Sequence, residues 1–425
     1  MLDIKFIREN PKLIKKTAQQ KHIEIDLRRL LKLDEARREL QQEIEQINAE
    51  KKEFSKRIGQ VSEDEKKQIL KALKKQSKKE KKLDAKYKRV YREFIDQMLH
   101  VPQVMDSRIP EGKDDSENVE IDKWGEIPQF AFTPKDHVQL GKNLGIIDIE
   151  RGVKLAGSRS YFLVGDGARL EQALFQFAID HLTKKGYKLL SVPVMVNRFA
   201  LIGTGYFPGA EEQTYSIEKD DKYLVGTSEV SVTSYHSDEI LDEEALPQKY
   251  IGISPCFRRE AGTYGKDTQG LYRVHQFNKV EQVIICKNDP ELSKQMHEEL
   301  MQNAREILQA LKLPYREVVL CTGDMGLGKH FANDIETWMP SRNNYGETHS
   351  CTTFLDFQAR RLNLRFRDMD GQVHFCHTLN NTVVASPRIL IPLLEIYQNP
   401  DGSVEIPDVL RPYMNGQERI ENPKS

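Results

Sequence analysis

The sequence predicts an α+β protein in which an N-terminal antiparallel α-helical coiled-coil arm precedes a body built on an antiparallel β-sheet flanked by helices. Residues 27–100 lack proline and space their apolar residues by three and four. Prolines and acidic residues follow, and strand-like segments then succeed one another through short turns. We therefore divide the chain into an arm (1–103), a linker (104–120) and a body (121–425).

The predicted arm is a hairpin of two helices. Glu65 stands three residues after Ser62, a capping-box pattern that starts a new helix after a turn. The narrow apolar stripe on both sides of this turn is typical of a two-stranded coil. Because a helix of about 35 residues is about 50 Å long, we expect a long hairpin.

Charged residues interrupt the apolar stripe of the hairpin. Pairing Ile47 with Leu83 places Lys51 opposite Glu80. We predict an ion pair that controls register, because a slipped hairpin would leave a charge against apolar neighbours. The alternative is that both side chains extend to water.

The arm is also basic. Its first hundred residues hold 28 Lys and Arg against 18 Asp and Glu, a net charge of +10, whereas the whole chain carries −1. This asymmetry indicates a polyanionic partner. Lysines surround the second helix in "KKQILKALKKQSKKEKKLDAKYKRVYR" and aromatic residues are few, which favours contacts to phosphates over readout of bases. A merely solvated face is the alternative.

Cysteine usage and the absence of long apolar runs indicate the compartment. The five cysteines are widely spaced and form no Cys-x-x-Cys or zinc-type cluster. The start "MLDIKFIREN" has no leader pattern, and nowhere do 18 apolar residues run uninterrupted. We expect a soluble, cytoplasmic protein that binds neither membranes nor DNA.

The body contains no phosphate-binding P-loop, and no Gly-x-Gly-x-x-Gly follows a strand. Its densest group of cations lies in "FRREAGTYGKDTQGLYRVHQF", residues 257–277, which is predicted to be a long hairpin with a glycine-rich loop. Alternation along strands places Arg258 with Glu260 on one face and Phe277 with Glu281 on another. A guanidinium suits phosphate, a phenyl ring suits a purine, and a carboxylate accepts from an ammonium or hydroxyl. An exposed hairpin with solvating charges is the alternative.

This hairpin resembles motif 2 of class II aminoacyl-tRNA synthetases, and in particular of bacterial-type seryl-tRNA synthetases. "SRSYFLVGDGARLEQALFQFAIDHLTKKGYKLLSVPVMV" resembles motif 1, and "HTLNNTVVASPRILIPLLEIYQNPDGSVEIPDVLRPYM" resembles motif 3. "LVGTSEV" is similar to the T-x-E loop of the family, and "IGTGYFPGAEEQTY" to the segment before it. The basic helical arm matches as well, so the resemblance covers essentially the whole chain.

The resemblance implies a serine–tRNA ligase with a class II catalytic domain. Such an enzyme would use ATP and Mg²⁺ to activate L-serine, and would transfer the seryl group to the 3′ end of serine tRNA. It would be a homodimer whose motif 1 builds the interface and whose arm holds the tRNA. The resemblance leaves open whether selenocysteine tRNA is a second acceptor.

Individual roles follow from the same resemblance. Arg258 would clamp the α-phosphate of ATP, Arg388 would hold the γ-phosphate, and Phe277 would stack on adenine. The implied catalytic residues are Arg258, Glu281 and Arg388. The implied ATP-binding residues are Arg258, Arg259, Glu260, Val274, Phe277, Glu347, Thr348, His349, Ser350 and Arg388. The implied serine-binding residues are Thr227, Ser228, Glu229, Arg258, Glu281, Asn380 and Thr382, and the implied Mg²⁺ ligands are Glu347 and Ser350.

Some positions depart from the usual pattern of the family. They are expected near the serine pocket and are Ser228, His349, Thr352, Thr353, Asn381, Val383 and Val384. Tolerated drift explains them, and a changed substrate preference is the alternative. Two other functions stay open: a class II paralogue that charges another acceptor, and a non-catalytic coiled-coil RNA-binding protein. The intact arm argues against the first, and the presence of Arg258, Glu281, Glu347 and Arg388 argues against the second.

Overall fold

The computed structural model describes residues 1–58, 62–262 and 270–421. Most of the predicted glycine-rich loop "AGTYGKDTQG" therefore lies outside the described residues. The chain divides into two compact units, Met1–Pro102 and Gln103–Ser425. Within the described ranges, no helix is both long enough and apolar enough to cross a membrane.

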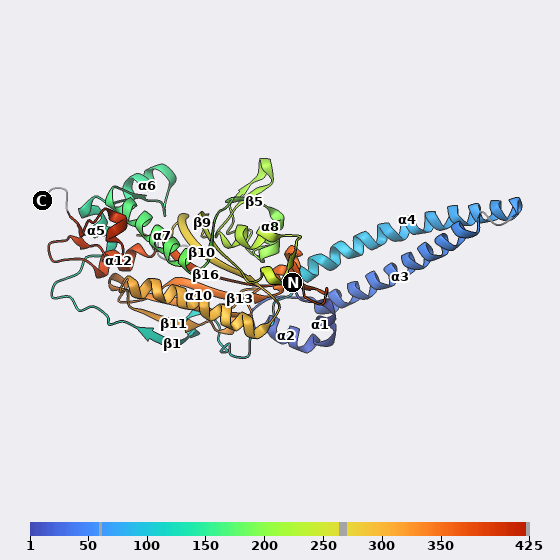
Figure 1. Cartoon of the computed structure of the whole chain (residues 1–425), viewed down its shortest axis with the longest axis horizontal. Coiled ribbons are helices and arrows are strands. Elements are labelled where there is room, and N and C mark those ends of the chain that lie inside the picture. Colours follow the sequence, from blue (N-terminus) through green and yellow to red (C-terminus); the bar gives the residue numbers. More distant parts are fainter. Residues whose placement is uncertain (59–61, 263–269, 422–425) are drawn as a thin grey trace. The chain divides into compact units, whose positions relative to one another are not determined.

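The described residues of the first unit form helices joined by short segments, as predicted for the arm. Figure 1 shows its two long helices side by side as a hairpin, and the structure confirms the capping box between Ser62 and Glu65 at the start of the second. Buried apolar residues such as Leu40, Ile47 and Phe94 form the seam. The helices of this unit are α1 (Ile4–Glu9), α2 (Pro11–Gln20), α3 (Leu27–Arg57) and α4 (Glu63–Leu99).

The predicted ion pair in the hairpin is present. Lys51 Nζ and Glu80 Oε2 are 2.6 Å apart, and the two side chains are 28% and 25% exposed. The pair is thus partly buried, which is the condition under which an unpaired charge would be costly. Nearer the base of the arm, the fully buried carboxylate of Asp34 contacts three arginines, which the sequence did not predict: Arg8, Arg37 and Arg38.

The second unit is built on an eight-stranded sheet in the order β1-β11-β12-β13-β16-β10-β9-β4. All neighbours are antiparallel except β4 and β9, which confirms the predicted fold class. Its strands are β1 (Val119–Trp124), β4 (Lys188–Ser191), β9 (Gln248–Phe257), β10 (Gln276–Cys286), β11 (Tyr315–Val319), β12 (Phe331–Met339), β13 (Asn344–Leu355) and β16 (His377–Ser386).

One face of this sheet is covered by α7 (Asp166–Lys184) and α10 (Pro290–Ala310) (Figure 1). Leu174 and Ile307 of these helices share a core cluster with Ile284 and Leu379 of the sheet. Because side chains alternate along a strand, neighbouring residues of β10, β13 and β16 face opposite sides. The face away from α10 is therefore left for a site.

The remaining elements are short. The helices are α5 (His137–Leu144), α6 (Ile149–Ala156), α8 (Arg198–Thr204), α9 (Glu229–Thr233), α11 (Phe357–Leu362) and α12 (Leu390–Ile396). The strands are β2 (Ile147–Asp148), β3 (Phe162–Leu163), β5 (Met195–Asn197), β6 (Ser216–Ile217), β7 (Lys222–Leu224), β8 (Ile240–Asp242), β14 (Arg365–Arg367), β15 (Val373–Phe375), β17 (Val404–Glu405) and β18 (Arg419–Ile420).

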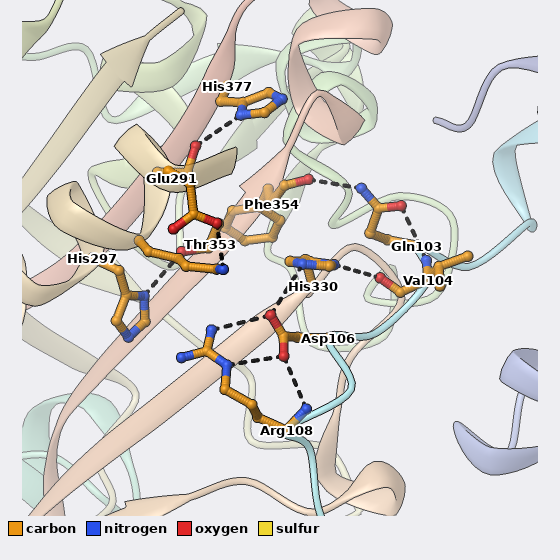
Figure 2. Close-up of polar contacts among 12 residues, drawn as sticks. Gln103, Val104, Asp106, Arg108, Glu291, His297, His330, Thr353, Phe354 and His377 are labelled. Atoms are coloured by element: carbon orange, nitrogen blue, oxygen red, sulfur yellow. Dashed lines mark hydrogen bonds and ion pairs between the residues drawn. The ribbon is translucent and has the colours of Figure 1, made fainter. Parts of the chain in front are cut away.

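The segment that begins the second unit is fastened to the sheet by specific polar contacts (Figure 2). Gln103 Nε2 donates to the Phe354 carbonyl over 3.0 Å. His330 Nδ1 donates to the Val104 carbonyl over 2.7 Å, and the Asp106 amide donates back to the His330 carbonyl over 2.9 Å. The first residues of the predicted linker thus form a hydrogen-bonded strap.

Candidate active site

A cavity of about 360 Å³ opens on the face of the sheet away from α10. β10, β13 and β16 supply its floor, and Gly326–Lys329 and Phe354 form part of its wall. The segment that begins at Gln103 is hydrogen-bonded to this wall, since the backbone N–H of Gln103 donates to the Leu327 carbonyl over 2.9 Å. The predicted site residues that line the cavity are Glu229, Arg258, Glu260, Val274, Phe277, Glu281, Glu347, Thr348, Ser350, Asn380, Thr382 and Arg388.

Four predicted residues do not line it. His349 points to the opposite face of β13, where its Nε2 donates to the Val383 carbonyl over 3.0 Å. Burial lowers the pKa of His349 to about 4, so the ring is neutral near pH 7. Thr227 and Ser228 are buried beside the cavity: the Ser228 hydroxyl donates to the Gly252 carbonyl over 3.0 Å. Arg259 is exposed.

Most of the departures from the family pattern also lie away from the cavity. Asn381 faces α10, where its amide donates to the Leu300 carbonyl over 3.0 Å. The Thr353 hydroxyl contacts His297 Nδ1 at 2.9 Å, and Val383 and Val384 belong to the main core. Only one of the departing residues, Thr352, lines the cavity. Most of these positions therefore do not line the cavity: strand alternation turns His349, Thr353 and Asn381 away from it, and a register shift in β16 places both Val383 and Val384 in the core.

At one end of the cavity a partly buried arginine, Arg388, is held in a fixed orientation. Arg388 Nη1 donates to the Glu347 carbonyl over 2.9 Å and to Glu347 Oε2 over 3.2 Å, and its Nε donates to the Tyr272 carbonyl over 3.1 Å. Burial alone would lower the pKa of Arg388, but the Glu347 carboxylate raises it above its usual value. Burial likewise opposes ionisation of Glu347, yet Arg388 and Arg258 hold its pKa below the usual range. Both groups are therefore charged near pH 7.

The other arginine of the cavity follows β9 directly. Arg258 Nε donates to the Gly226 carbonyl over 3.3 Å, and its guanidinium carbon lies 5.2 Å from the centre of the Phe277 ring. β9 ends at Phe257 and Glu260 has a φ of +51°, so the predicted alternation of Arg258 and Glu260 on one strand face does not apply. Both still reach the cavity, where Arg273 Nη1 bonds Glu260 Oε2 at 2.8 Å.

The opposite end of the cavity is acidic and buried. Glu281 is 1% exposed, and its Oε1 accepts from the Asn380 amide over 2.9 Å. Glu229 accepts from the Tyr206 hydroxyl over 3.0 Å and from the Gln358 amide over 2.8 Å. Burial first, and then the charge of Glu281, raise the pKa of Glu229. Such fixed acceptors suit a small ligand that carries hydrogen-bond donors.

Several residues of the cavity were not predicted from the sequence. Lys279 lines it beside Glu281, and its spacing of two from Phe277 and from Glu281 on the same strand was a usable signal. Tyr206 also lines it, and Gln358 bonds Glu229 from outside the lining. Both come from segments far from β10 in the sequence, and no local pattern marks them.

No group of three or more His, Cys, Asp and Glu side chains in the described ranges could by itself hold a metal ion. Glu347 and Ser350 nevertheless line the cavity with oxygen atoms, and the neighbouring, half-buried Asp334 has a buried Oδ1 without a hydrogen-bond partner. Burial and the nearby Glu347 raise the pKa of Asp334 to about 8. Mg²⁺ commonly takes one or two protein oxygens and completes its shell with phosphate and water, so this donor set fits a cation that arrives with a nucleotide.

The antiparallel sheet, the cationic hairpin and the hydrogen-bonded Arg388 define a class II aminoacyl-tRNA synthetase. Residues 213–397 match the family model of the tRNA synthetase class II core domain (G, H, P, S and T). Residues 1–105 match that of the seryl-tRNA synthetase N-terminal domain. A serine–tRNA ligase of Deinococcus radiodurans is 44% identical over 100% of both chains. The chain therefore belongs to the seryl-tRNA synthetase family.

Solved structures agree with this assignment over the whole length. Seryl-tRNA synthetase of Pyrococcus horikoshii complexed with ATP is 37% identical, with a TM-score of 0.89 over 99% of this chain and 100% of that one. A cytoplasmic serine–tRNA ligase of Naegleria fowleri in complex with AMP is 29% identical, with a TM-score of 0.86 over 100% of this chain and 99% of that one.

Proposed function

We propose that the protein activates L-serine with ATP to give seryl-adenylate and then transfers the seryl group to the 3′ end of serine tRNA. One observation carries the proposal: a single cavity has two arginines and an aromatic ring toward one end and buried carboxylates at the other. The first end suits a nucleoside triphosphate, and the second suits a small amino acid with a hydroxyl.

The residues act by positioning and by charge. The serine carboxylate attacks the α-phosphorus, a new P–O bond forms, and the bond to the leaving pyrophosphate breaks. We assign Arg258 to the α-phosphate and Arg388 to the γ-phosphate, with Phe277 stacking on adenine. Both arginines are already fixed by hydrogen bonds, so they stabilise developing negative charge without reorganising.

Glu347 and Ser350 would hold Mg²⁺, which would neutralise part of the charge on the triphosphate. Glu281, Asn380 and Thr382 would receive the amino acid. Thr227 and Ser228 are buried beside the cavity and would support the residues that receive the amino acid.

We also propose a homodimer. Large apolar side chains lie exposed in and beside the motif 1 segment, as expected for a surface that a second copy covers: Val153 (43%), Leu155 (76%), Phe162 (42%) and Val164 (44%). The lysine-rich face of α4 would contact phosphates of the tRNA. We expect aminoacylation of this tRNA to take place in the cytoplasm. Selenocysteine tRNA as a second acceptor stays a prediction.

Serine-dependent exchange of pyrophosphate into ATP, measured with serine, threonine, alanine and glycine, tests the activation step. We expect serine to be preferred over alanine by about 10⁴, because alanine would leave buried polar groups unpaired. Exchange without charging of serine tRNA would favour another acceptor. Exchange with none of the amino acids would favour a non-catalytic RNA-binding protein.

Replacing residues 30–97 by a short loop separates the two halves of the function. Serine-dependent exchange should survive and charging of serine tRNA should collapse. A folded, dimeric deletion variant that charges tRNA as well as the full chain would show that the arm is only a spacer.

A further inference from the structure

Lys279 forms a buried ion pair inside the amino-acid end of the cavity. Its Nζ lies 2.5 Å from Glu281 Oε2, and the two side chains are only 7% and 1% exposed. Residues two apart on a strand share a face, so both line the cavity. Asn380 donates to the other oxygen, Oε1, over 2.9 Å, whereas Oε2 is ion-paired to Lys279 and accepts no hydrogen bond within the described residues.

The surroundings of Glu281 hold a second buried acid. Glu229 on α9 lies close enough that its pKa is raised, after burial, by the charge of Glu281, while Lys279 acts in the opposite direction. The charge of Glu281 also acts on Tyr206 after α8, Cys256 of β9 and Cys351 of β13, and Arg258 acts on the first two in the opposite direction. Among these side chains, Lys279 is the cation in direct contact with the Glu281 carboxylate.

Two buried carboxylates in one small space do not both stay ionised without a cation, because like charges raise the pKa of one of them. A protonated Glu281 would present an O–H donor where an ionised one presents only acceptors. The ammonium and hydroxyl of serine are donors, so the protonated form would meet them poorly. Burial of an unpaired charge after removal of one partner is also costly.

We propose that Lys279 is a positioning residue for amino-acid binding: it keeps Glu281 ionised and oriented so that this carboxylate accepts hydrogen bonds from the amino acid. This inference rests on the proposed function and deepens it. It identifies the ion pair as the element that makes the pocket select an amino acid rich in donors.

The test compares Lys279→Met, which keeps the chain length, with Lys279→Arg, which keeps the charge. Michaelis constants for serine and ATP are measured in pyrophosphate exchange between pH 6 and 8.5, where the ammonium of free serine is largely intact. For Lys279→Met we expect the serine KM to rise about 100-fold at pH 6.5, because the buried Glu281 carboxylate loses its paired cation. It should fall again as the pH rises and Glu281 ionises, while the KM for ATP stays within about threefold. The wild type and Lys279→Arg should show a serine KM that is nearly independent of pH.

The double variant Lys279→Met/Glu281→Gln keeps the test valid if the single variant folds poorly, because removing both charges of a buried pair is often tolerated. Its serine KM should be high and independent of pH. A serine KM of Lys279→Met that is unchanged, or equally raised at every pH, overturns the inference. Recovery at high pH that persists in the double variant also overturns it, because another group would then be titrating. A wild type without serine-dependent exchange overturns the proposed function itself and this inference with it.

Discussion

Arg258→Lys is the substitution that most directly tests the assignment of the phosphate end. The guanidinium lies in the cavity, donates through Nε to the Gly226 carbonyl over 3.3 Å, and lies 5.2 Å from the centre of the Phe277 ring. Lysine keeps the positive charge but loses the planar fork and the Nε–H. The change therefore removes geometry and leaves charge.

The structure separates the effect on catalysis from the effect on folding. Arg258 is an exposed residue on the cavity wall, so its replacement should change the free energy of unfolding by less than about 1 kcal/mol. Loss of one well-placed electrostatic donor in the transition state costs about 3 kcal/mol, or about 100-fold in rate. The loss of activity should thus far exceed any loss of stability.

The assay is serine-dependent pyrophosphate exchange, with thermal denaturation to check folding. Arg259→Lys is the matched control, because this neighbouring arginine is exposed but does not line the cavity. We expect a loss of about 100-fold for Arg258→Lys and less than about threefold for Arg259→Lys. Equal effects of the two substitutions, or full activity of a folded Arg258→Lys variant, would refute the placement of the phosphate clamp.

Three further predictions concern the arm and the pH dependence of folding. Lys51→Met and Glu80→Leu should each destabilise the arm by about 1–3 kcal/mol, whereas the double variant should recover most of this stability. Hydrogen exchange of arm amides in the full chain measures the stability of the arm, and a double variant whose loss equals the sum of the two single losses would contradict register control. Neutralising the exposed lysines of α4 should weaken tRNA binding and reduce the slope of log affinity against log salt concentration by about one for each tRNA phosphate that a lysine no longer neutralises. Binding titrations from about 50 to about 200 mM salt measure this slope, and an unchanged slope would count against the interface. The residues to change are Lys74, Lys75, Lys78, Lys79, Lys81 and Lys82. Burial lowers the pKa of His297, His349 and His377 to about 4, so the unfolded chain takes up more protons below about pH 6.5 and stability should fall from there toward pH 4. In urea titrations, His349→Gln should lose about 2 kcal/mol less than the wild type between pH 7.5 and 5, and identical losses would show that this histidine is not held neutral.

Local sequence patterns were sufficient to predict the helical hairpin of the arm and which residues share a face on β10. Helix periodicity and a capping box place the hairpin, and pairing of its stripe places Lys51 opposite Glu80, because each of these depends on residues that are near in sequence or related by one turn. Alternation on β10 likewise gives the common face of Phe277 and Glu281. These features need no knowledge of distant contacts.

The errors arose where distant segments meet. The departures at Asn381 and His349 are close in sequence to residues that line the cavity, yet one position along a strand turns a side chain away: Asn381 bonds the Leu300 carbonyl of α10, and His349 bonds the Val383 carbonyl of β16. Gln358 and Tyr206 could not be found, since they reach Glu229 from α11 and from the segment after α8. Only the assembled sheet brings these groups together.

Charge illustrates the same distinction between local and assembled properties. The near-zero net charge of the chain conceals a basic arm, and it also conceals a cavity lined by several pairs of cations and carboxylates. Within that cavity three ion pairs hold particular charges in place: Arg388 with Glu347, Glu260 with Arg273, and Glu281 with Lys279. A substrate that carries phosphates and an ammonium would therefore meet charges that are already fixed in place, which is the arrangement that preorganised electrostatic catalysis requires. Composition alone cannot report such an arrangement, because it depends on which charges the fold brings within about 4 Å of one another.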